Sequence, residues 1–427
     1  MEPVIGLDFG TTNSAIAVTD SSRRATLAAF ADGPATTNNF RSILYFPAKE
    51  RGARQRSETK AGPEAINAYL EDETKGRLIV SVKSYLASEL FFATSIEGRF
   101  YTLEDLVAII LRRLRMAAME QFDTPASRVV LGRPVRFSGA ENEKDEALAL
   151  ERLRSAAALA GFEQISFEFE PVAAAYQYET QLDHDELVLI GDFGGGTSDF
   201  TLAQLGPGRK QAGRNPVIGT SGVPIAGDTF DSRIMMQLVA PKLGLGSHYV
   251  SLGKELPVPV WVYSQLSSWH HMFLLKDPKT MGILQQVKRQ ASERDKVSAL
   301  IQIISENLGY ALYRAVEHTK VELTEKELGS FSFSQSTVQM DDSLERWQFE
   351  SWIQEDIQKI AACIRALLDG AGIRPNDIDR VFLTGGTSFV PVVRRFFSRT
   401  FGADKLRSGE ELTTVAKGLA LRALEES

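Results

Sequence analysis

The apolar residues of this chain are grouped in short runs, and two pairs of these runs form a segment that occurs twice. Residues 4–18 read VIGLDFGTTNSAIAV and residues 187–205 read LVLIGDFGGGTSDFTLAQL. In each copy an apolar run ends in Asp-Phe-Gly, a Gly/Thr turn follows, and a second apolar run begins. Short apolar runs bounded by turn residues are typical of buried strands. Each copy therefore predicts a strand, a tight turn and a second strand.

Asp8 and Asp192 occupy equivalent places in the two copies. Tight Gly/Thr turns direct backbone N–H groups and short hydroxyls into a concavity that suits phosphate oxygens. An aspartate at a strand end can hold a hydrated Mg²⁺, and without a partner it would be costly in a half-buried place. One such turn is equally typical of a plain hairpin. Two in a duplicated frame predict two lobes that close on one polyphosphate.

A third segment of this kind lies near the C-terminus, where residues 381–397 read VFLTGGTSFVPVVRRFF. The pattern predicts a strand, a Gly-Gly loop, and a helix with Pro391 near its first turn. Gly385 and Gly386 would let a ligand approach the backbone closely. The sequence thus contains three candidate phosphate-binding segments.

The order of these three segments resembles the actin-like ATPase superfamily, in which ATP binds between two related halves. The amino-acid sequence of these segments is similar to that of the seventy-kilodalton heat-shock chaperones of the DnaK type, and especially to that of their shortened bacterial YegD-like branch. The resemblance extends in family order from Val4 to about Ala423. It implies an α/β fold with two ribonuclease-H-like lobes and a nucleotide cleft between them, with ATP or ADP and Mg²⁺ as ligands.

The resemblance also implies individual roles. In SVKSYLASEL, Lys83 falls where the family keeps the lysine that reaches the γ-phosphate and the attacking water. Glu170, in FEFEPVAAAYQYE, would join Asp8 and Asp192 in orienting Mg²⁺ through water. Thr197 completes the implied catalytic set. The implied phosphate contacts of the two repeated loops are Gly10, Thr11, Thr12, Gly194, Gly195, Gly196 and Thr197, with Asp199 beside them.

Other matched segments imply contacts to the rest of the nucleotide. IAGDTFDSR places Gly227 beside it, and YRAVEHTKVELT places Glu317 and Lys320 at the ribose. Pro134, in VVLGRPVRFSG, would be the hinge-side proline. The segment TGGTSFVP supplies the remaining implied contacts Gly385, Gly386, Thr387 and Phe389.

The chain departs from the family pattern at the adenine and at its end. Val321 and Phe389 fall where the family has two arginines that sandwich the base. Phe389 could still stack on adenine, but the cation is lost. We therefore expect base recognition to be less secure than phosphate recognition. Since the sequence stops soon after Gly418, we also expect an ATPase core without the usual peptide-binding domain.

Several of these residues have plainer interpretations. A lysine such as Lys83 is usually on a solvated surface. Glu170, next to Pro171, could simply begin a helix with a favourable negative charge. Thr197 and Asp199 could shape their turn through side-chain to backbone bonds.

The length of 427 residues exceeds one typical core and predicts two lobes. The first would cover residues 1–184, with a smaller subdomain at about 39–119. The second would cover residues 185–427, with a mobile subdomain at about 230–310. Its last helix, after Thr414, would return to the hinge.

Composition narrows the class of protein. The net charge of −7 argues against general nucleic-acid binding. The sole cysteine, Cys363, lies in a helical run as a small core residue and can form no internal disulfide, which fits a reducing cytoplasm. The N-terminus shows no leader, and no stretch has transmembrane length, so membrane insertion is not expected.

Motifs of other enzyme classes are absent from the sequence. It has no GxxxxGK[ST] loop and no His-Arg-Asp catalytic loop. His270 and His271 lack a second ligand pair at metal spacing and are interpreted as structural or surface residues.

The tryptophans form two sequence clusters. Trp261 and Trp269 lie in the stretch 241–281, which has no good family match, and Trp347 and Trp352 lie in ERWQFESWI. Each cluster could fill a core or form a partner-binding patch.

The sequence therefore predicts a slow Mg²⁺-ATPase whose lobe closure is read by an unknown protein partner or client. Three alternatives stay open at this point. They are a nucleotide-sensing module with little turnover, a sugar- or acetate-kinase-like phosphotransferase, and a filament-forming actin relative.

Overall fold

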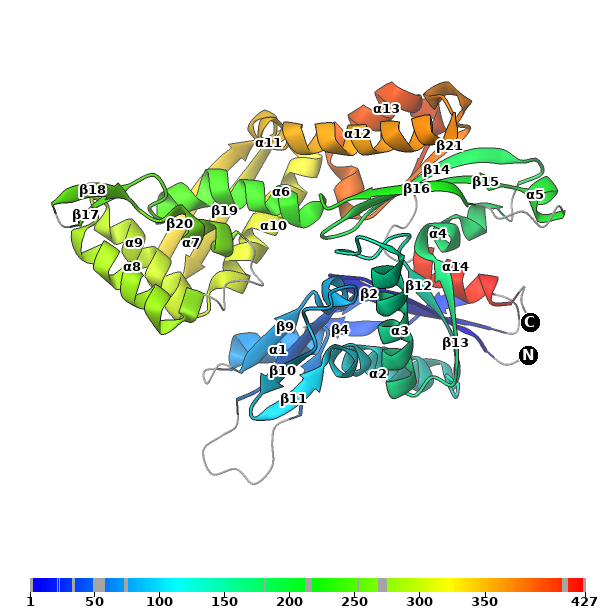
Figure 1. The fold of residues 1–427 in the computed structure, drawn as a ribbon, viewed down its shortest axis with the longest axis horizontal. Coiled ribbons are helices and arrows are strands. Elements are labelled where there is room, and N and C mark those ends of the chain that lie inside the picture. Colours follow the sequence, from blue (N-terminus) through cyan, green and yellow to red (C-terminus); the bar gives the residue numbers. More distant parts are fainter. Residues whose placement is uncertain are drawn as a thin grey trace. The chain divides into compact units, whose positions relative to one another are not determined.

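The computed structural model describes the chain except for residues 1–2, 21, 23, 33–34, 49–57, 73–75, 180–181, 212–216, 252, 268–274, 409–413 and 425–427. The fold is α/β and divides into two compact units (Figure 1). Unit 1 comprises Met1–Pro224, Ala361–Ser388 and Arg395–Ser427, and unit 2 comprises Ile225–Ile360 and Phe389–Arg394. Trp269, His270 and His271 lie outside the described residues.

Unit 1 contains the first copy of the repeated segment in a mixed sheet with the order β13-β12-β1-β2-β3. Strand β1 is parallel to β12 and antiparallel to β2, and β12 is parallel to β13. The short strand β6 (Phe40–Arg41) pairs with the start of β2. The strand bounds are β1 Ile5–Phe9, β2 Asn13–Thr19, β3 Ala25–Leu27, β12 Arg128–Arg133 and β13 Gln164–Phe169.

The second copy forms another sheet of unit 1, with the order β16-β15-β14-β21-β22. Strand β14 is antiparallel to β15 and parallel to β21, as β1 is to β2 and β12. The two sheets therefore have matching order and direction, as the duplicated sequence pattern predicts. The bounds are β14 Glu186–Phe193, β15 Ser198–Leu205, β16 Val217–Val223, β21 Arg380–Thr384 and β22 Leu406–Ser408.

Two long helices cover the first sheet. Helix α2 (Leu103–Phe122) begins with a capping box formed by Thr102 and Asp105, and α3 (Glu143–Leu159) begins with the Asn142 side chain, which accepts bonds from two backbone N–H groups. The apolar positions of α2 recur at helical spacing and share one buried core with residues of β1, β2 and β12. Each fully buried Leu or Ile there contributes roughly 1.5–3 kcal/mol.

Small residues allow two shorter helices to cross closely. Helix α4 (Glu170–Glu179) and helix α14 (Thr414–Arg422) pack together beside β1 and β12. A Cβ at Gly418 would lie 1.8 Å from the carbonyl oxygen of Ala173, and a Cβ at Gly6 would lie 2.2 Å from that of Ala416. Glycine is therefore required at both places for the backbones to approach.

The remaining elements of unit 1 form a smaller layer and several connections. Strands β7, β8 and β9 make a three-stranded sheet, whereas β4 pairs with β5 and β10 with β11. Helices α12 and α13 contribute residues to both units. Bounds are β4 Phe30–Asp32, β5 Ala35–Thr37, β7 Ile43–Phe46, β8 Lys60–Ala61, α1 Pro63–Glu71, β9 Arg77–Val80, η1 Val82–Tyr85, β10 Ala93–Ile96, β11 Arg99–Thr102, α5 Pro207–Gln211, α12 Gln354–Ala371, η5 Pro375–Asp377, η6 Gly386–Phe389, α13 Pro391–Phe401 and η7 Ala403–Lys405.

Unit 2 is mainly helical and carries a two-stranded sheet, β19-β20, whose alternate residues are buried. The alternation is that of a hairpin with one face on helix α10. Bounds are α6 Gly227–Ile234, η2 Met235–Val239, η3 Ala240–Leu243, β17 His248–Ser251, β18 Lys254–Pro257, α7 Val260–Leu266, α8 Pro278–Gln290, α9 Arg294–Ser305, α10 Gly309–Glu325, β19 Leu328–Gln335, β20 Val338–Glu345 and α11 Arg346–Trp352.

Trp261 is 45% exposed and Trp347 is 64% exposed. The interpretation of these two tryptophans as core residues is therefore wrong, because each leaves much of its ring in solvent. A partner-binding role stays a prediction.

Within the described part of the chain, no helix combines the length and apolarity that crossing a membrane requires.

We expect Gly418→Ala to destabilise the protein by about 2–3 kcal/mol, because the added methyl group would force α14 away from α4. Chemical denaturation followed by circular dichroism measures the change. The matched control is Gly282→Ala in α8, where no described atom lies within 4 Å of the added Cβ. This control should gain about 0.5–1 kcal/mol from helix propensity. Equal effects of the two variants would contradict the close crossing.

Candidate functional site

The first glycine-threonine loop, residues 10–12, connects β1 to β2 and is hydrogen-bonded to Ser42, which lies outside the loop. A Cβ at Gly10 would lie 2.0 Å from the carbonyl oxygen of Asn13, so the turn requires glycine. The Ser42 hydroxyl donates to the Gly10 carbonyl at 2.6 Å, and the Ser42 N–H donates to the Thr12 carbonyl at 2.9 Å. Ser14 lies 2.9 Å from the same hydroxyl. These bonds fix the loop before any ligand binds.

The second loop, residues 194–197, connects β14 to β15 in the same way. The Gly194 N–H donates to the Thr197 carbonyl at 2.9 Å, which closes the turn. The Thr197 hydroxyl donates to the Asp199 carboxylate at 2.9 Å. Asp199 is paired in register with Asp192 on the neighbouring strand. Thr197 and Asp199 therefore shape the turn, and Asp199 also interacts electrostatically with Asp192, Glu170 and Lys83.

The third loop follows β21 and packs against the second. Gly385 has φ = +82°, and a Cβ there would lie 2.0 Å from the carbonyl oxygen of Phe193. The hydroxyl of Thr384 donates to Asp192 Oδ1 at 2.6 Å. Gly386 and Thr387 begin the short helix η6. The structure thus brings two of the three candidate phosphate segments into contact.

Lys83 and Glu170 form a buried ion pair, with Lys83 Nζ 2.7 Å from Glu170 Oε1. Each residue is only 8% exposed, which excludes the surface interpretation of Lys83. Lys83 lies in η1 directly after Ser81 and Val82, and Ser81 has a left-handed backbone with φ = 54°. Glu170 begins α4, and a Cβ at Gly132 would lie 2.9 Å from its Cγ. Gly132 therefore leaves room for this carboxylate.

Asp8, Glu170, Asp192 and Asp199 make up a carboxylate group around Lys83. Burial raises the pKa of each carboxyl, and repulsion by neighbouring carboxylates adds to the effect at Asp8, Glu170 and Asp199. For Asp199 the pKa rises to about 7. The ammonium of Lys83 lowers the pKa of all four. Asp8, Lys83, Glu170 and Asp192, which lie far apart in the sequence, are therefore one electrostatic site.

Four carboxyls share the ammonium of Lys83, so a further positive charge at this place would favour their charged forms. Among the described residues, however, no group of three or more His, Cys, Asp or Glu side chains is placed so that it could hold a metal ion. These carboxylates would therefore reach a cation only through water molecules.

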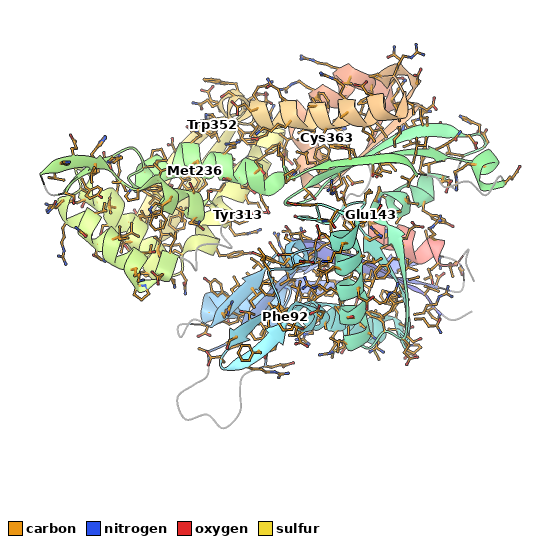
Figure 2. All side chains as sticks on the ribbon, viewed as in Figure 1. Phe92, Glu143, Met236, Tyr313, Trp352 and Cys363 are labelled. Carbon is orange, nitrogen blue, oxygen red and sulfur yellow. The ribbon has the colours of Figure 1, made fainter. Side chains whose placement is uncertain are left out.

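The residues expected at the nucleoside lie in unit 2. Lys320 Nζ is 2.7 Å from Asp231 Oδ2 and 3.3 Å from the Gly227 carbonyl oxygen. Tyr313 of α10 (Figure 2) donates to Asp231 at 3.2 Å. Burial raises the pKa of Asp231 to about 6, although Lys320 opposes the shift. Lys320 thus contacts α6 at two places, the Gly227 carbonyl and the Asp231 carboxylate.

Glu317 pairs with Arg314, whose guanidinium lies 2.6 Å from its carboxylate. Val321 and Phe389, at the expected adenine positions, are 53% and 45% exposed. Two apolar side chains with this exposure are available to a ligand.

The sequence patterns did not single out Ser42, Thr384 or Asp231. Thr384 directly precedes the Gly-Gly pair, and Asp231 lies in the quoted segment IAGDTFDSR, so both had a local signal. Ser42 had none, since only the pairing of β6 with β2 places it at the first loop.

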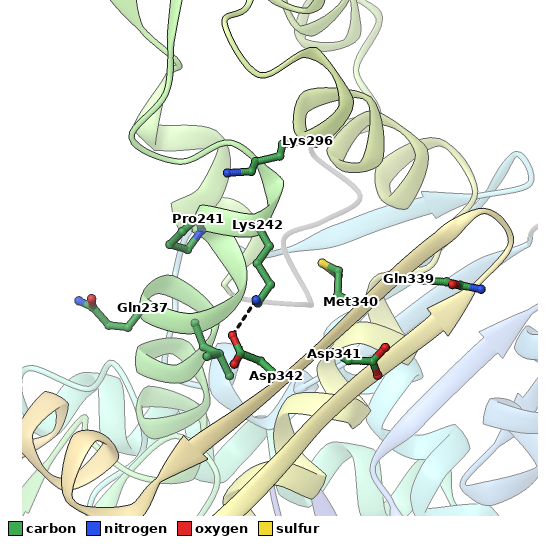
Figure 3. Close-up of a pocket in the computed structure, with 9 residues that line it drawn as sticks. Gln237, Pro241, Lys242, Lys296, Gln339, Met340, Asp341 and Asp342 are labelled. Carbon is green, nitrogen blue, oxygen red and sulfur yellow. Dashed lines mark ion pairs between the residues drawn. The ribbon is translucent and has the colours of Figure 1, made fainter.

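A separate hollow of about 590 Å³ lies in unit 2 between η2, η3, α9 and the strand β20 (Figure 3). Lys242 Nζ and Asp342 Oδ2 are 2.6 Å apart on its wall. Its lining also includes Met340 and Lys296. None of the residues expected at the nucleotide lines it.

Comparison with known proteins agrees with these features. The family described as Hsp70 protein matches residues 4–242 and 293–424. Among curated proteins, the "Chaperone protein DnaK" of Thermosipho africanus (strain TCF52B) is 26% identical over 430 residues. That alignment covers 99% of this chain and 59% of the relative, so the chain spans about three fifths of the relative's length. The repeated sheets, the glycine loops and the matched residues lead to one conclusion: the chain belongs to the Hsp70 family, whose nucleotide-binding domain has the two-lobed actin-like ATPase fold.

Proposed function

We propose that this chain binds Mg²⁺-ATP and hydrolyses it slowly, with water as the phosphoryl acceptor. The observation that carries the proposal is the buried Lys83–Glu170 pair, set among carboxylates from both repeated strands. Membership of the Hsp70 family supports ATP as the ligand.

The loops of unit 1 would hold the phosphates through backbone N–H groups and hydroxyls. In this proposal Gly10, Thr11 and Thr12 form one contact, and the loop at residues 194–197 forms another. Gly385, Gly386 and Thr387 complete the set. The bonds from Ser42 and within the second loop fix these backbones in advance, so little ordering is needed when a ligand binds.

Asp8, Asp192 and Glu170 would hold Mg²⁺ through its water molecules. When bound, the ion supplies positive charge to phosphate oxygens and to the carboxylates around it. Binding of Mg²⁺ through its water molecules needs no cluster of side chains that ligate the ion, and the described residues contain none.

Lys83 would stabilise the negative charge that develops on the transferred phosphoryl group. Burial lowers the pKa of Lys83, but the carboxylates of Glu170 and Asp8 outweigh burial and the pKa lies above its ordinary value. The side chain therefore stays an ammonium at neutral pH. Glu170 orients it by the 2.7 Å contact. Catalysis would come mainly from positioning and electrostatics.

Gly227, Glu317, Lys320 and Phe389 would contact the nucleoside. Phe389 offers an exposed ring for stacking, while Val321 supplies no cation where the family has one. We therefore propose that phosphate contacts dominate the affinity.

A nucleotide-sensing module with little turnover is the second candidate. Two observations favour it: Lys83 is already engaged by Glu170, and the base positions lack cations. A single-turnover assay separates the two candidates, because the sensor would bind ATP without releasing phosphate.

We also propose three features that are expected from the family and the sequence. They are binding of a client protein, a cytoplasmic location, and lobes at residues 1–184 and 185–427. Capture of proteins on the ATP-bound and ADP-bound chain would identify a partner whose binding depends on the nucleotide.

We expect Lys83→Ala to lower the turnover rate by about 100-fold or more and to leave the Kd for Mg²⁺-ATP within several-fold, because the ammonium acts on the transition state. Single-turnover phosphate release and calorimetry measure the two quantities. The matched control is Lys296→Ala, which removes an exposed ion pair with Glu293 in unit 2 and should change neither. Parallel losses of rate and affinity would indicate a structural lysine, and a wild-type chain that binds neither ATP nor ADP would refute the proposed function.

We expect Asp199→Asn to raise stability at pH 8 by roughly 1–4 kcal/mol and to have little effect near pH 4. Burial raises the folded-state pKa of Asp199 from 3.8 to about 7. The unfolded chain therefore releases this proton first as the pH rises, and the wild-type protein loses stability between these two values. Asparagine keeps the acceptor for Thr197 but does not ionise.

Urea unfolding from pH 4 to pH 8 measures this effect. Asp377→Asn is the control with the opposite sign, because the hydrogen bond from Arg374 holds the pKa of Asp377 below its ordinary value. That variant should lose stability above the unfolded pKa. A pH profile of Asp199→Asn that follows the wild type throughout would contradict the raised pKa.

A further inference from the structure

Arg152, on helix α3, binds the segment that carries Lys83, although the two residues are far apart in the sequence. Its Nη1 donates to the carbonyl oxygens of Leu86 at 3.0 Å, Ser88 at 2.9 Å and Tyr85 at 3.4 Å. Its Nη2 donates to the carbonyl oxygen of Phe91 at 3.1 Å. One guanidinium thus binds four carbonyls, one from the last residue of η1 and three from the residues that follow it.

Arg152 is buried, and its charge and its N–H donors have partners in the protein. The residue is 9% exposed, and its Nε lies 3.4 Å from the Glu104 carboxylate at the start of α2. A buried guanidinium needs both a counter-charge and acceptors for its donors. Glu104 supplies the first and the four carbonyls supply the second. The loop in turn needs the donors, because carbonyls buried without a partner are costly.

Helix α3 braces the partner of Lys83 as well. Glu146, on the same helix, accepts a bond from the Phe137 N–H at 2.8 Å and lies 3.2 Å from Arg133 Nη2. The guanidinium of Arg133 lies 4.9 Å from the ring centre of Phe169, the residue before Glu170. The residue before Glu170 and the residues after Lys83 are therefore both linked to α3.

We propose that Arg152 is a positioning residue, which holds the segment 82–91 on α3 and so sets the place of Lys83 at the site. The proposal rests on the function proposed above for Lys83. The segment needs such a brace because it follows the left-handed Ser81 and has a single turn of helix. Nothing in the charge or spacing of Arg152 along the sequence distinguishes it from the neighbouring Arg154.

A double-mutant cycle tests whether Arg152 acts through Lys83. Arg152→Met keeps the apolar stem and removes the guanidinium. It should slow single-turnover hydrolysis on the order of 10- to 100-fold, with the Kd for Mg²⁺-ATP within several-fold, because a small misplacement of a catalytic group has an effect of this size. In the Lys83→Ala background the same change should slow the residual rate less than about twofold. Equal fold losses in the two backgrounds would overturn the proposal.

A second measurement needs no nucleotide. The N–H groups of Ser84, Leu86 and Ser88 donate to carbonyls within residues 81–85. The hydrogen exchange of these N–H groups should become at least about tenfold faster in Arg152→Met. In Arg152→Lys, which keeps the positive charge but loses the several N–H donors of the guanidinium, the exchange rate should be intermediate. Unchanged exchange in both variants would overturn the proposal.

Arg154→Met is the matched control. Arg154 lies on the same helix, donates to the Ile165 carbonyl at 3.0 Å and is exposed. It should change neither the rate nor the exchange of the three N–H groups. If Arg154→Met accelerates exchange as much as Arg152→Met, the brace is not specific and the proposal fails. A wild-type chain without turnover would refute the proposed function alone, while the exchange measurement would still decide whether Arg152 holds the segment.

Discussion

Burial of like charges is the constraint on which the candidate site of unit 1 depends. Asp8, Glu170, Asp192 and Asp199 are held in surroundings that disfavour their ionised forms, and Lys83 is the cation that all four share. An arrangement of this kind is costly in an isolated protein, because desolvation of each charge is only partly offset. A ligand that brings positive charge would relieve the cost. Such a ligand would also stabilise the folded state, since whatever binds the native form stabilises it.

Close backbone approach is the second requirement, and glycine meets it at each critical place. Gly10 permits the turn after β1, and Gly385 permits the loop after β21 to lie against the end of β14. Gly418 lets α14 lie against α4. Gly132 serves the charge constraint directly, because it leaves space for the Glu170 side chain. A side chain at any of these positions would displace backbone or a charged group, so stability and the geometry of the site depend on the same residues.

The bracing contacts explain how a short, partly strained segment can carry a buried lysine. η1 is a single turn, and its own hydrogen bonds hold it weakly. Arg152 and Glu146 attach the two sides of the ion pair to α3, a helix with a strong N-cap. The long helix therefore acts as a rigid frame for groups that local structure alone would leave loose. In unit 2, Asp231 of α6 has a comparable place, because it binds Lys320 and Tyr313 of α10.

The sequence by itself determined the local elements: the two repeated strand–turn–strand segments, the Gly-Gly loop before α13, and the equivalence of Asp8 with Asp192. These follow from the short-range alternation of apolar and turn residues, which acts over a few positions. Only the tertiary structure decided which distant groups meet. The pairing of Lys83 with Glu170, of Thr384 with Asp192, and of Arg152 with the carbonyls after Tyr85 spans 61 to 192 residues. The exposure of Trp261 and Trp347 was equally undetermined, because a tryptophan has one local pattern whether or not a neighbouring element covers it. Contacts of this range depend on strand order and helix packing, for which the chain carries no local signal.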